Sequence, residues 1–287
     1  MLRAAPLRYR IGPFTVAVQC NIEPASAVFH DLYSDCPIAE ADTISDYRFQ
    51  LQRPFGARRW LRPQAEFVAD GEKPFAPLPL DSAFPLLEWG FNWSVATTAH
   101  QYLMLHAAVV EKSDQAIVLP AMPGSGKSTL CAALVHRGWR LLSDEFGLVR
   151  PGSIELVAFP RCIPIKNDAI DVIRQFAPQA RIGPVFRKTR KGDVAHVKPP
   201  EHSVRRADEP AVIRHIVFPL FRAGSALELK PISKARACIK LCSNSFNYEI
   251  MGVEGFRTVA DLIDASDCHL LRYSNLDEGI RAIDALL

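Results

Sequence analysis

Alternating apolar and polar positions mark the N-terminal part of the chain. Residues 7–19 (LRYRIGPFTVAVQ) and 44–53 (ISDYRFQLQR) have the period of two that is typical of half-buried strands. The rest of this region, down to Pro85, is rich in Pro, Ala and Asp. Residues 84–100 (FPLLEWGFNWSVATTAH) then carry large apolar side chains at helical spacing. The pattern predicts a small β-rich N-terminal module over residues 1–83 and a helix that joins it to the rest.

After this helix the pattern changes to strands separated by helices. Residues 102–111 (YLMLHAAVVE) and 116–120 (AIVLP) are typical of adjacent buried strands, and residues 127–138 (KSTLCAALVHRG) of a helix that ends at Gly138. Further strands are predicted at 139–144, 146–151, 154–159, 213–219 and 268–274, and helices at 167–176, near 233–242 and 256–265, and from Leu276 to the end. The alternation predicts an α/β fold, with one catalytic domain over residues 84–287.

The composition of 287 residues, 48% hydrophobic and 23% charged, is that of a soluble globular protein. A net charge of +3 does not indicate a nucleic acid or an anionic membrane as partner. The start of the chain lacks the apolar stretch of a secretory signal. The longest apolar region, FAPLPLDSAFPLLEWGFNW, is interrupted by three prolines and two acids, which makes it a poor membrane span. We therefore expect a cytoplasmic protein that binds neither membranes nor nucleic acid.

The seven cysteines are scattered singly along the chain. The closest pair, Cys238 and Cys242, is four residues apart within a predicted helix, which is not the spacing of a zinc ribbon or of a redox motif. We expect reduced thiols that are mostly buried.

The segment AIVLPAMPGSGKSTL has the order of elements that a phosphate-binding loop needs. A strand aims the loop, glycines free its backbone N–H groups, and a helix N-terminus faces the anion, with a lysine for the β- and γ-phosphates and a hydroxyl for Mg²⁺. Ala121 stands where the pattern G-x-x-x-x-G-K-[ST] has its first glycine, so the entry turn must differ slightly. The residues predicted to hold ATP are Pro123, Gly124, Ser125, Gly126, Lys127, Ser128 and Thr129, with Ser128 also on Mg²⁺.

The sequence downstream of the loop favours a kinase-like site. No N-K-x-D motif of switch GTPases and no LSGGQ-like signature of ABC ATPases is present. Asp144 follows Lys127 by 17 residues, which leaves room for a helix of about three turns and a return strand. Asp144 and Glu145 would then lie beside the loop, where open α/β sheets bind ligands. One carboxylate can accept a proton from an attacking hydroxyl and the other can support Mg²⁺. We assign the base to Asp144 and the metal to Glu145.

At this point the chain resembles a known family. LHAAVV, followed by GSGKST, HRGWRLLSDE and VR, is similar to the catalytic core of HPr kinase/phosphorylase. The resemblance implies that His106 corresponds to the histidine of the strand before the loop and orients the catalytic acid. Lys127 and Ser128 correspond to the loop pair, and Asp144 to the catalytic aspartate. Glu145 falls on the second acid of the family, as Glu rather than Asp. The implied fold is the P-loop kinase core shared with ATP-type phosphoenolpyruvate carboxykinase.

The resemblance extends to the group called HprK-related kinase A, through FPRCIPIKNDAI, KTRKGDVAHVKPP, VFP and NSFNYEIMGVEGF. It implies an ATP-dependent, serine kinase-like protein and supplies no acceptor. Two departures limit what it implies. The N-terminal module does not resemble the one that precedes the kinase core in HPr kinase. The family's metal-binding glutamate has no clear counterpart, and Glu155 is the nearest acid.

Several basic residues are further candidates for contacts with phosphate or substrate. Arg161 and Lys166 flank a turn before a predicted helix, as a solvated pair or as ligands of phosphate. A cationic run before Gly192 is either a solvated stretch or a mobile clamp on the transferring phosphate. The members of this run and its neighbours are Arg187, Lys188, Arg190, Lys191, His196 and Lys198. The NSFNY segment at 244–248 is either packing or part of the substrate rim.

These observations predict an ATP- and Mg²⁺-dependent kinase that phosphorylates a hydroxyl, by resemblance the serine of a protein or peptide such as a small carrier encoded nearby. Two alternatives stay open. A small-molecule kinase would have a closed, polar acceptor pocket rather than an open groove. An ATP-binding regulatory or scaffold protein would bind nucleotide with little turnover. A homo-oligomer is compatible with the sequence, which does not identify the acceptor or show whether the reaction reverses.

Overall fold

The computed structural model describes residues 5–56 and 62–287 and shows a mixed α/β fold. The described strands form a five-stranded, an eight-stranded and a three-stranded sheet. The predicted fold class is therefore confirmed at the level of a mixed α/β protein. The kinase-type core and the division into residues 1–83 and 84–287 stay predictions.

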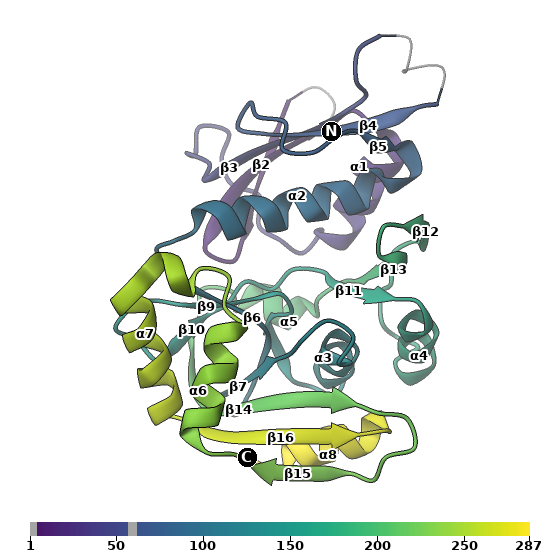
Figure 1. Cartoon of the computed structure of the whole chain (residues 1–287). Coiled ribbons are helices and arrows are strands. Elements are labelled where there is room, and N and C mark those ends of the chain that lie inside the picture. Colours follow the sequence, from purple (N-terminus) through teal and green to yellow (C-terminus); the bar gives the residue numbers. More distant parts are fainter. Residues whose placement is uncertain (1–4, 57–61) are drawn as a thin grey trace.

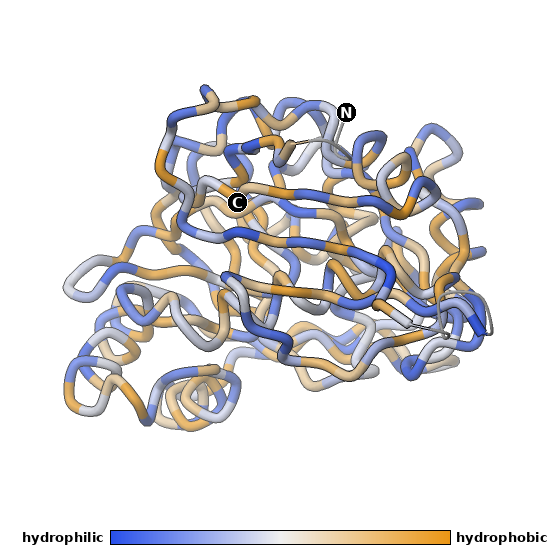
Figure 2. The backbone as a smooth tube through the Cα atoms, turned by 90° about the horizontal axis from the view of Figure 1, so that it is seen from above, coloured by the Kyte–Doolittle hydropathy of each residue, from blue (hydrophilic) through white to orange (hydrophobic). Residues whose placement is uncertain are grey.

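The N-terminal sheet follows the order of the chain. Its strands are β1 (Leu7–Ile11), β2 (Phe14–Cys20), β3 (Tyr47–Gln52), β4 (Gln64–Ala69) and β5 (Leu78–Pro79). Only β2 and β3 are parallel neighbours. From above, hydrophilic and hydrophobic positions alternate along strands nearest the viewer, as expected for a sheet with one buried face (Figure 2). The stretch predicted as one strand over 7–19 turns at Gly12, where φ is 56°.

Two helices pack with this sheet. Helix α1 (Glu23–Leu32) lies in a region where the sequence predicted only β structure, although its buried Ala25, Phe29 and Leu32 have helical spacing. Helix α2 (Ala83–Thr98) follows a 3₁₀ turn, η2 (Leu80–Ser82), and confirms the predicted helix. Figure 1 shows α2 lying between the N-terminal sheet and the rest of the chain. Because α2 is buried on most sides, it belongs to the packing of both parts.

The eight-stranded sheet carries the segment with the phosphate-loop pattern. Its strands are β6 (Leu103–Lys112), β7 (Gln115–Pro120), β8 (Arg140–Ser143), β9 (Phe146–Val149), β10 (Glu155–Val157), β14 (Ala211–Phe221), β15 (Glu228–Pro231) and β16 (Asp267–Tyr273). The order is β10-β9-β6-β7-β14-β16-β15, with β8 also beside β6. Strand β10 also pairs with β14, so the strands from β10 to β14 in this order form a closed ring. The predicted strands are confirmed, and β15 is additional.

Helices cover both faces of this sheet. Helices α3 (Lys127–Val135) and α8 (Leu276–Asp284) share one apolar cluster with it, and α6 (Lys234–Ser243) and α7 (Tyr248–Asp264) share another. Helix α7 begins eight residues before the predicted start and kinks at Gly252. The short α5 (Glu201–Arg205) was not predicted. All seven cysteines are free thiols and five of them are buried.

The basic segment over 181–200 forms part of a small sheet. Strand β13 (Gly192–Val197) pairs with β11 (Ile163–Lys166) on one side and β12 (Phe186–Thr189) on the other, and α4 (Asp168–Phe176) follows β11. Residues 186–197 are therefore a β-hairpin, where the sequence indicated only a basic segment.

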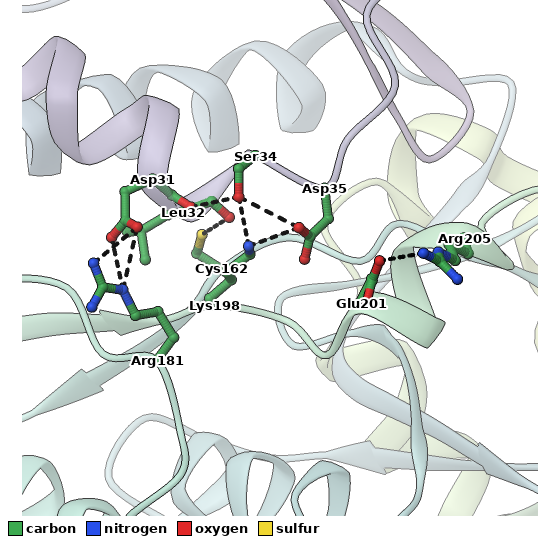
Figure 3. Close-up of polar contacts among 9 residues, drawn as sticks. All are labelled: Asp31, Leu32, Ser34, Asp35, Cys162, Arg181, Lys198, Glu201 and Arg205. Atoms are coloured by element: carbon green, nitrogen blue, oxygen red, sulfur yellow. Dashed lines mark hydrogen bonds and ion pairs between the residues drawn. The ribbon is translucent and has the colours of Figure 1, made fainter.

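A buried ion pair connects the N-terminal helices to this sheet. Arg161 Nη2 lies 2.6 Å from Glu88 Oε2, and the guanidinium stacks 3.9 Å from the centre of the Phe91 ring. Tyr33, directly after α1, donates a hydrogen bond to the other oxygen of Glu88 at 2.7 Å. Two further ion pairs add to the same junction, an exposed one between Asp31 and Arg181 (3.0 Å) and a partly buried one between Asp35 and Lys198 (2.8 Å) (Figure 3).

The Glu88→Ala variant should lose about 3–5 kcal/mol of unfolding free energy, because it leaves the Arg161 charge buried without a partner. The Asp31→Ala variant breaks an exposed pair with Arg181 and should lose no more than about 1 kcal/mol. Urea unfolding at pH 7 measures both. An equally small loss of unfolding free energy in both variants would contradict the view that the Glu88–Arg161 pair holds the two parts together.

Candidate active site

The C-terminal ends of β14 and β16 form hydrogen bonds with the loop between β7 and α3. The backbone N–H of Phe221 donates to the carbonyl oxygen of Ser125 at 2.9 Å, and the Tyr273 hydroxyl donates to that of Gly126 at 3.3 Å. A Cβ on Gly126 would lie 2.8 Å from Cβ of Phe221 and 2.9 Å from the Tyr273 hydroxyl, and φ there is 87°. Only glycine fits this position, because it combines a left-handed backbone with a close approach.

The departure at Ala121 has a simple structural basis. Gly124 (φ 85°) and Gly126 (φ 87°) have left-handed backbones, whereas Ala121 is not among the described residues with positive φ. Alanine is therefore unstrained at the start of this loop. The loop keeps glycine where the backbone requires it.

The N-terminus of α3 is open to an anion. No side chain caps it, and Gly126 occupies the cap position. The first-turn N–H groups of Lys127, Ser128 and Thr129 have no acceptor within a helix. Such groups, together with the helix dipole, form a ready site for phosphate.

Asp144 lies where the return strand β8 ends, beside the loop. Lys127 Nζ donates to its backbone carbonyl oxygen, and the Ser128 hydroxyl donates to its Oδ2 at 2.7 Å. The side chain is only 4% exposed, and its Oδ1 accepts no N–H or O–H hydrogen bond from the described residues, although the Cys131 thiol interacts with the carboxylate. Burial raises the pKa of Asp144 to about 6, even though Lys127 and Ser128 act in the opposite direction. A buried carboxylate with one free oxygen thus faces the loop.

His106 contacts the second acid rather than Asp144. Its Nε2 lies 3.7 Å from Oε1 of Glu145, which follows Asp144 directly. Burial and the charge of Lys127 lower the pKa of His106. Burial acts to raise the pKa of Glu145, but the positive charges of Lys127 and His106, with those of two further lysines, outweigh it and lower that pKa. Glu145 is therefore the ionised partner of the histidine. The expectation that His106 orients the catalytic acid holds only if that acid is Glu145.

A cavity of about 610 Å³ contains these residues. The whole predicted loop from Pro123 to Thr129 lines it, as do His106 and both acids. Four predicted phosphate or substrate contacts also line it: Arg161, Lys166, Lys191 and His196. Three others, Arg187, Lys188 and Arg190, and the acid Glu155 are not among the lining residues.

Two of the four basic residues in the cavity are not free cations. The Arg161 charge is compensated by Glu88. Burial lowers the pKa of His196 to about 4, so that its ring is neutral at pH 7. Lys166 and Lys191 have no carboxylate within ion-pair distance in the described part of the chain. Partial burial, and then the charge of Lys191, lower the pKa of Lys166.

The cationic run lies in the turn of the β12–β13 hairpin, which hydrogen bonds close. Thr189 Oγ1 donates to the carbonyl oxygen of Gly192 at 2.7 Å, and Asp193 accepts from the Lys188 backbone N–H at 2.9 Å. Arg187 is 77% exposed and lies 3.6 Å from Asp193. Of the run, only Lys191 reaches the cavity, where its Nζ lies 5.6 Å from the centre of the Trp89 ring.

The NSFNY segment is mainly structural. Asn247 is buried, accepts a hydrogen bond from the Met104 N–H at 2.9 Å and donates one to the Tyr102 carbonyl at 2.8 Å. These bonds tie the start of α7 to β6. Phe246 packs against the His106 ring with centres 5.2 Å apart. Asn247 thus supports the strand that positions His106.

Sequence analysis missed the wall that α2 contributes to the cavity. Glu88, Trp89 and Asn92 line it, although their helix was interpreted only as a connection. A signal was present, because Glu88 and Asn92 are four residues apart on one face of an otherwise apolar helix.

No protein-family model matches this chain, and neither does any of the curated proteins compared with it. Within residues 5–56 and 62–287, none of the helices combines the length and the apolar character that crossing a membrane requires.

The burial of Asp144 predicts a specific pH dependence of stability. Its pKa is about 6 in the folded protein and ~3.9 in an unfolded chain, so the folded protein binds the extra proton between these values. Stability therefore falls as the pH rises through that window. The Asp144→Asn variant lacks this loss and should gain on the order of 3 kcal/mol relative to the wild type from pH 4 to 6, with no further gain above.

Urea unfolding at pH 4 to 8 in the presence of EDTA measures this difference. The Asp171→Asn variant is a matched control, because Asp171 is exposed on α4. Parallel pH profiles of wild type and Asp144→Asn would contradict the burial of the Asp144 carboxyl group.

Proposed function

We propose that the protein is an ATP- and Mg²⁺-dependent phosphotransferase that transfers the γ-phosphoryl group to a hydroxyl. The main support for this proposal is the arrangement of Lys127 and Ser128 around the buried Asp144. Its Oδ1 accepts no N–H or O–H hydrogen bond from the described residues. A strand, a glycine loop and an uncapped helix N-terminus surround this arrangement. These are the parts by which P-loop proteins hold and activate a nucleotide triphosphate.

The polyphosphate is assigned to the loop and the start of α3. Backbone N–H groups of residues 124–129 would bind phosphate oxygens, and Lys127 would reach the β- and γ-phosphates. Lys191 and Lys166 also line the cavity, with no carboxylate within ion-pair distance in the described part of the chain. Lys127 can stabilise the charge that spreads over the transferring group.

The residues present fit Mg²⁺. The Ser128 hydroxyl and the free oxygen of Asp144 are hard oxygen ligands, and nucleotide sites hold this ion with one or two protein oxygens, phosphates and water. A site built wholly from protein is not needed, and no group of three or more His, Cys, Asp or Glu suited to a metal occurs in residues 5–56 and 62–287. When bound, Mg²⁺ neutralises part of the phosphate charge.

The two acids offer two ways to handle the proton of the acceptor. Asp144 has a pKa of about 6 and can accept that proton near neutral pH. Its bond to Ser128 also suits the support of Mg²⁺, which would leave the proton to Glu145 and His106, 3.7 Å apart. The structure thus adds a second assignment to the one predicted from sequence, and the Asp144 variant below separates them.

A switch GTPase is a weaker alternative. Asp144 to Gly147 spell the D-x-x-G motif, whose glycine lies in a phosphate-contacting loop in GTPases. Here Gly147 is part of β9 and packs against Val109 and Leu105. No N-K-x-D sequence exists to select guanine. A regulatory ATP-binding protein shares the same nucleotide site and differs only in turnover.

Two considerations bear on the class of the acceptor, and they favour different acceptors. The resemblance to HPr kinases favours the serine of a protein or peptide. The cavity of about 610 Å³, to which α2 contributes Glu88, Trp89 and Asn92, favours a small molecule, because its volume lies in the range of small-molecule sites.

The Lys127→Ala variant should bind ATP about 10- to 100-fold more weakly, because it loses a charge-assisted hydrogen bond to phosphate. Calorimetric titration with ATP and Mg²⁺ measures the affinity, and circular dichroism shows that the variant is folded. Lys230→Ala, on the exposed strand β15, is the control and should match the wild type. Unchanged affinity in Lys127→Ala would refute the nucleotide site.

The Asp144→Asn variant distinguishes a base from a metal support and an enzyme from a scaffold. If Asp144 accepts the proton, ADP formation should fall about 10²–10⁴-fold at unchanged Mg-ATP affinity. If it supports Mg²⁺, the affinity for Mg-ATP should fall with it, while the affinity for ATP in EDTA stays the same. Equal turnover and equal affinity in both proteins would leave the scaffold as the better description.

A further inference from the structure

Two elements outside the loop region also line the cavity. Helix α2 contributes Trp89 and Asn92, and the small sheet contributes one of its faces. In the register of β11 and β13, Pro164 lies opposite His196 and Lys166 opposite Val194. Because such pairs share a face, all four side chains point the same way, and all four line the cavity.

The other face of the small sheet is part of the hydrophobic core. Ile163, Ile165, Ala195 and Val197 are fully buried in the same cluster as α3. The sheet is therefore fixed against the helix that begins at the phosphate loop. Its polar face lies at a defined place relative to Lys127.

Several polar groups on this side of the cavity lack partners. His196 is only 3% exposed, yet its Nδ1 has no hydrogen-bond partner among the described residues. Asn92 uses its side-chain oxygen to accept from Arg161, and none of the described residues accepts from its amide nitrogen. Lys166 and Lys191 are exposed cations with no carboxylate within ion-pair distance among the described residues. A buried polar group without a partner is uncommon, so the unpaired ring nitrogen of His196 points to a ligand, and the two lysines favour an anionic one.

The charge and size of this space define the ligand. Two lysines and two potential hydrogen-bond donors, the amide of Asn92 and the ring of His196, would receive an anionic group with further oxygens. Trp89 offers a flat apolar wall. The cavity of about 610 Å³ must also hold phosphates of the nucleotide, so the space left suits a molecule of a few carbon atoms. Phe84 of α2 packs edge-on against His196 with ring centres 5.1 Å apart, which closes this side.

We propose that Trp89, Asn92, Lys166, Lys191 and His196 form an acceptor subsite for a small hydroxylated anion, a hydroxy acid or a phosphate ester with a free hydroxyl. The proposal rests on the proposed phosphotransferase function. The acceptor oxygen forms a bond to the γ-phosphorus, the bond from that phosphorus to the β–γ bridging oxygen breaks, and ADP leaves with the electron pair. The hydroxyl proton passes to a carboxylate of Asp144 or Glu145.

Calorimetry with three small probes tests the subsite. Glycerate, glycerol phosphate and glycerol are titrated into the protein saturated with Mg²⁺ and a non-hydrolysable ATP analogue. At least one anion should bind saturably, and about tenfold or more better than glycerol, because a charge-assisted bond is worth about that factor. The two anions distinguish a carboxylate from a phosphate ligand. Failure of both to bind better than glycerol would overturn the subsite.

Variants locate the bound anion. Lys191→Gln and His196→Phe should weaken its binding about tenfold or more, while the affinity for the ATP analogue stays within about threefold. Trp93→Ala is the control, because Trp93 lies on α2 but is 39% exposed, contacts Phe75 and is not among the lining residues. Should Lys191→Gln weaken the nucleotide and spare the anion, Lys191 belongs to the polyphosphate and the subsite is wrong. Lys191 is exposed, so this variant is expected to fold even if His196→Phe does not.

The Lys127→Ala variant separates the subsite from the proposed function. It should lose the nucleotide yet bind the anion as the wild type does without nucleotide. Loss of the anion in Lys127→Ala would place it in the phosphate loop and overturn the subsite. If the wild type binds the anion through Lys191 but binds no nucleotide, the anion site stands and the phosphotransferase function fails.

Discussion

The buried ion pair between Glu88 and Arg161 determines where α2 lies relative to the phosphate loop. A guanidinium in this position costs several kcal/mol of desolvation unless a carboxylate and further hydrogen bonds compensate it. Glu88, Tyr33 and Asn92 supply these contacts, and the Phe91 ring covers one face of the guanidinium. Three of these residues lie on α2 and Tyr33 directly follows α1, so the segment that enters the small sheet is tied to the N-terminal helices. The cavity exists in its present form because this pair holds its two walls together.

The Glu88–Arg161 ion pair also affects the balance of charge inside the cavity. Arg161 is compensated and His196 is neutral, which leaves the three lysines Lys127, Lys166 and Lys191 to face the carboxylates of Asp144 and Glu145. Each lysine raises the preference of the site for an anion and lowers the pKa of neighbouring bases, as seen for His106. A polyanion such as a nucleotide triphosphate would complete this balance. On the proposed function, this excess of positive charge would be in place before a phosphate binds.

The local structure of the loop could be predicted from sequence because its parts are close together in the chain. The strand, the two left-handed glycines, Lys127 and the return to Asp144 lie within 30 residues, and each has its own signal in residue type or spacing. The α2 wall could not be found this way, because it depends on a contact between residues 88 and 161. The sequence also could not identify the partner of His106. Asp144 and Glu145 are adjacent, and only the folded structure shows which of the two faces the histidine. Helix α1 was missed because Pro24 and small residues look like a loop until the spacing of its buried residues is counted.

The hairpin of β12 and β13 shows how local turn chemistry selects one cation out of four. Two hydrogen bonds fix its turn, one from the Thr189 hydroxyl to the Gly192 carbonyl oxygen and one from the Lys188 backbone N–H to the Asp193 carboxylate. Gly192 has a φ of 85° in this turn. Strands then alternate their side chains, so the run cannot present all its charges to one side. Lys191, at the turn, is directed over Trp89, while Arg187 is directed to solvent and Asp193. The density of charge in the sequence therefore overstates the positive charge in the cavity, and a single lysine from this hairpin connects the small sheet to the wall of α2.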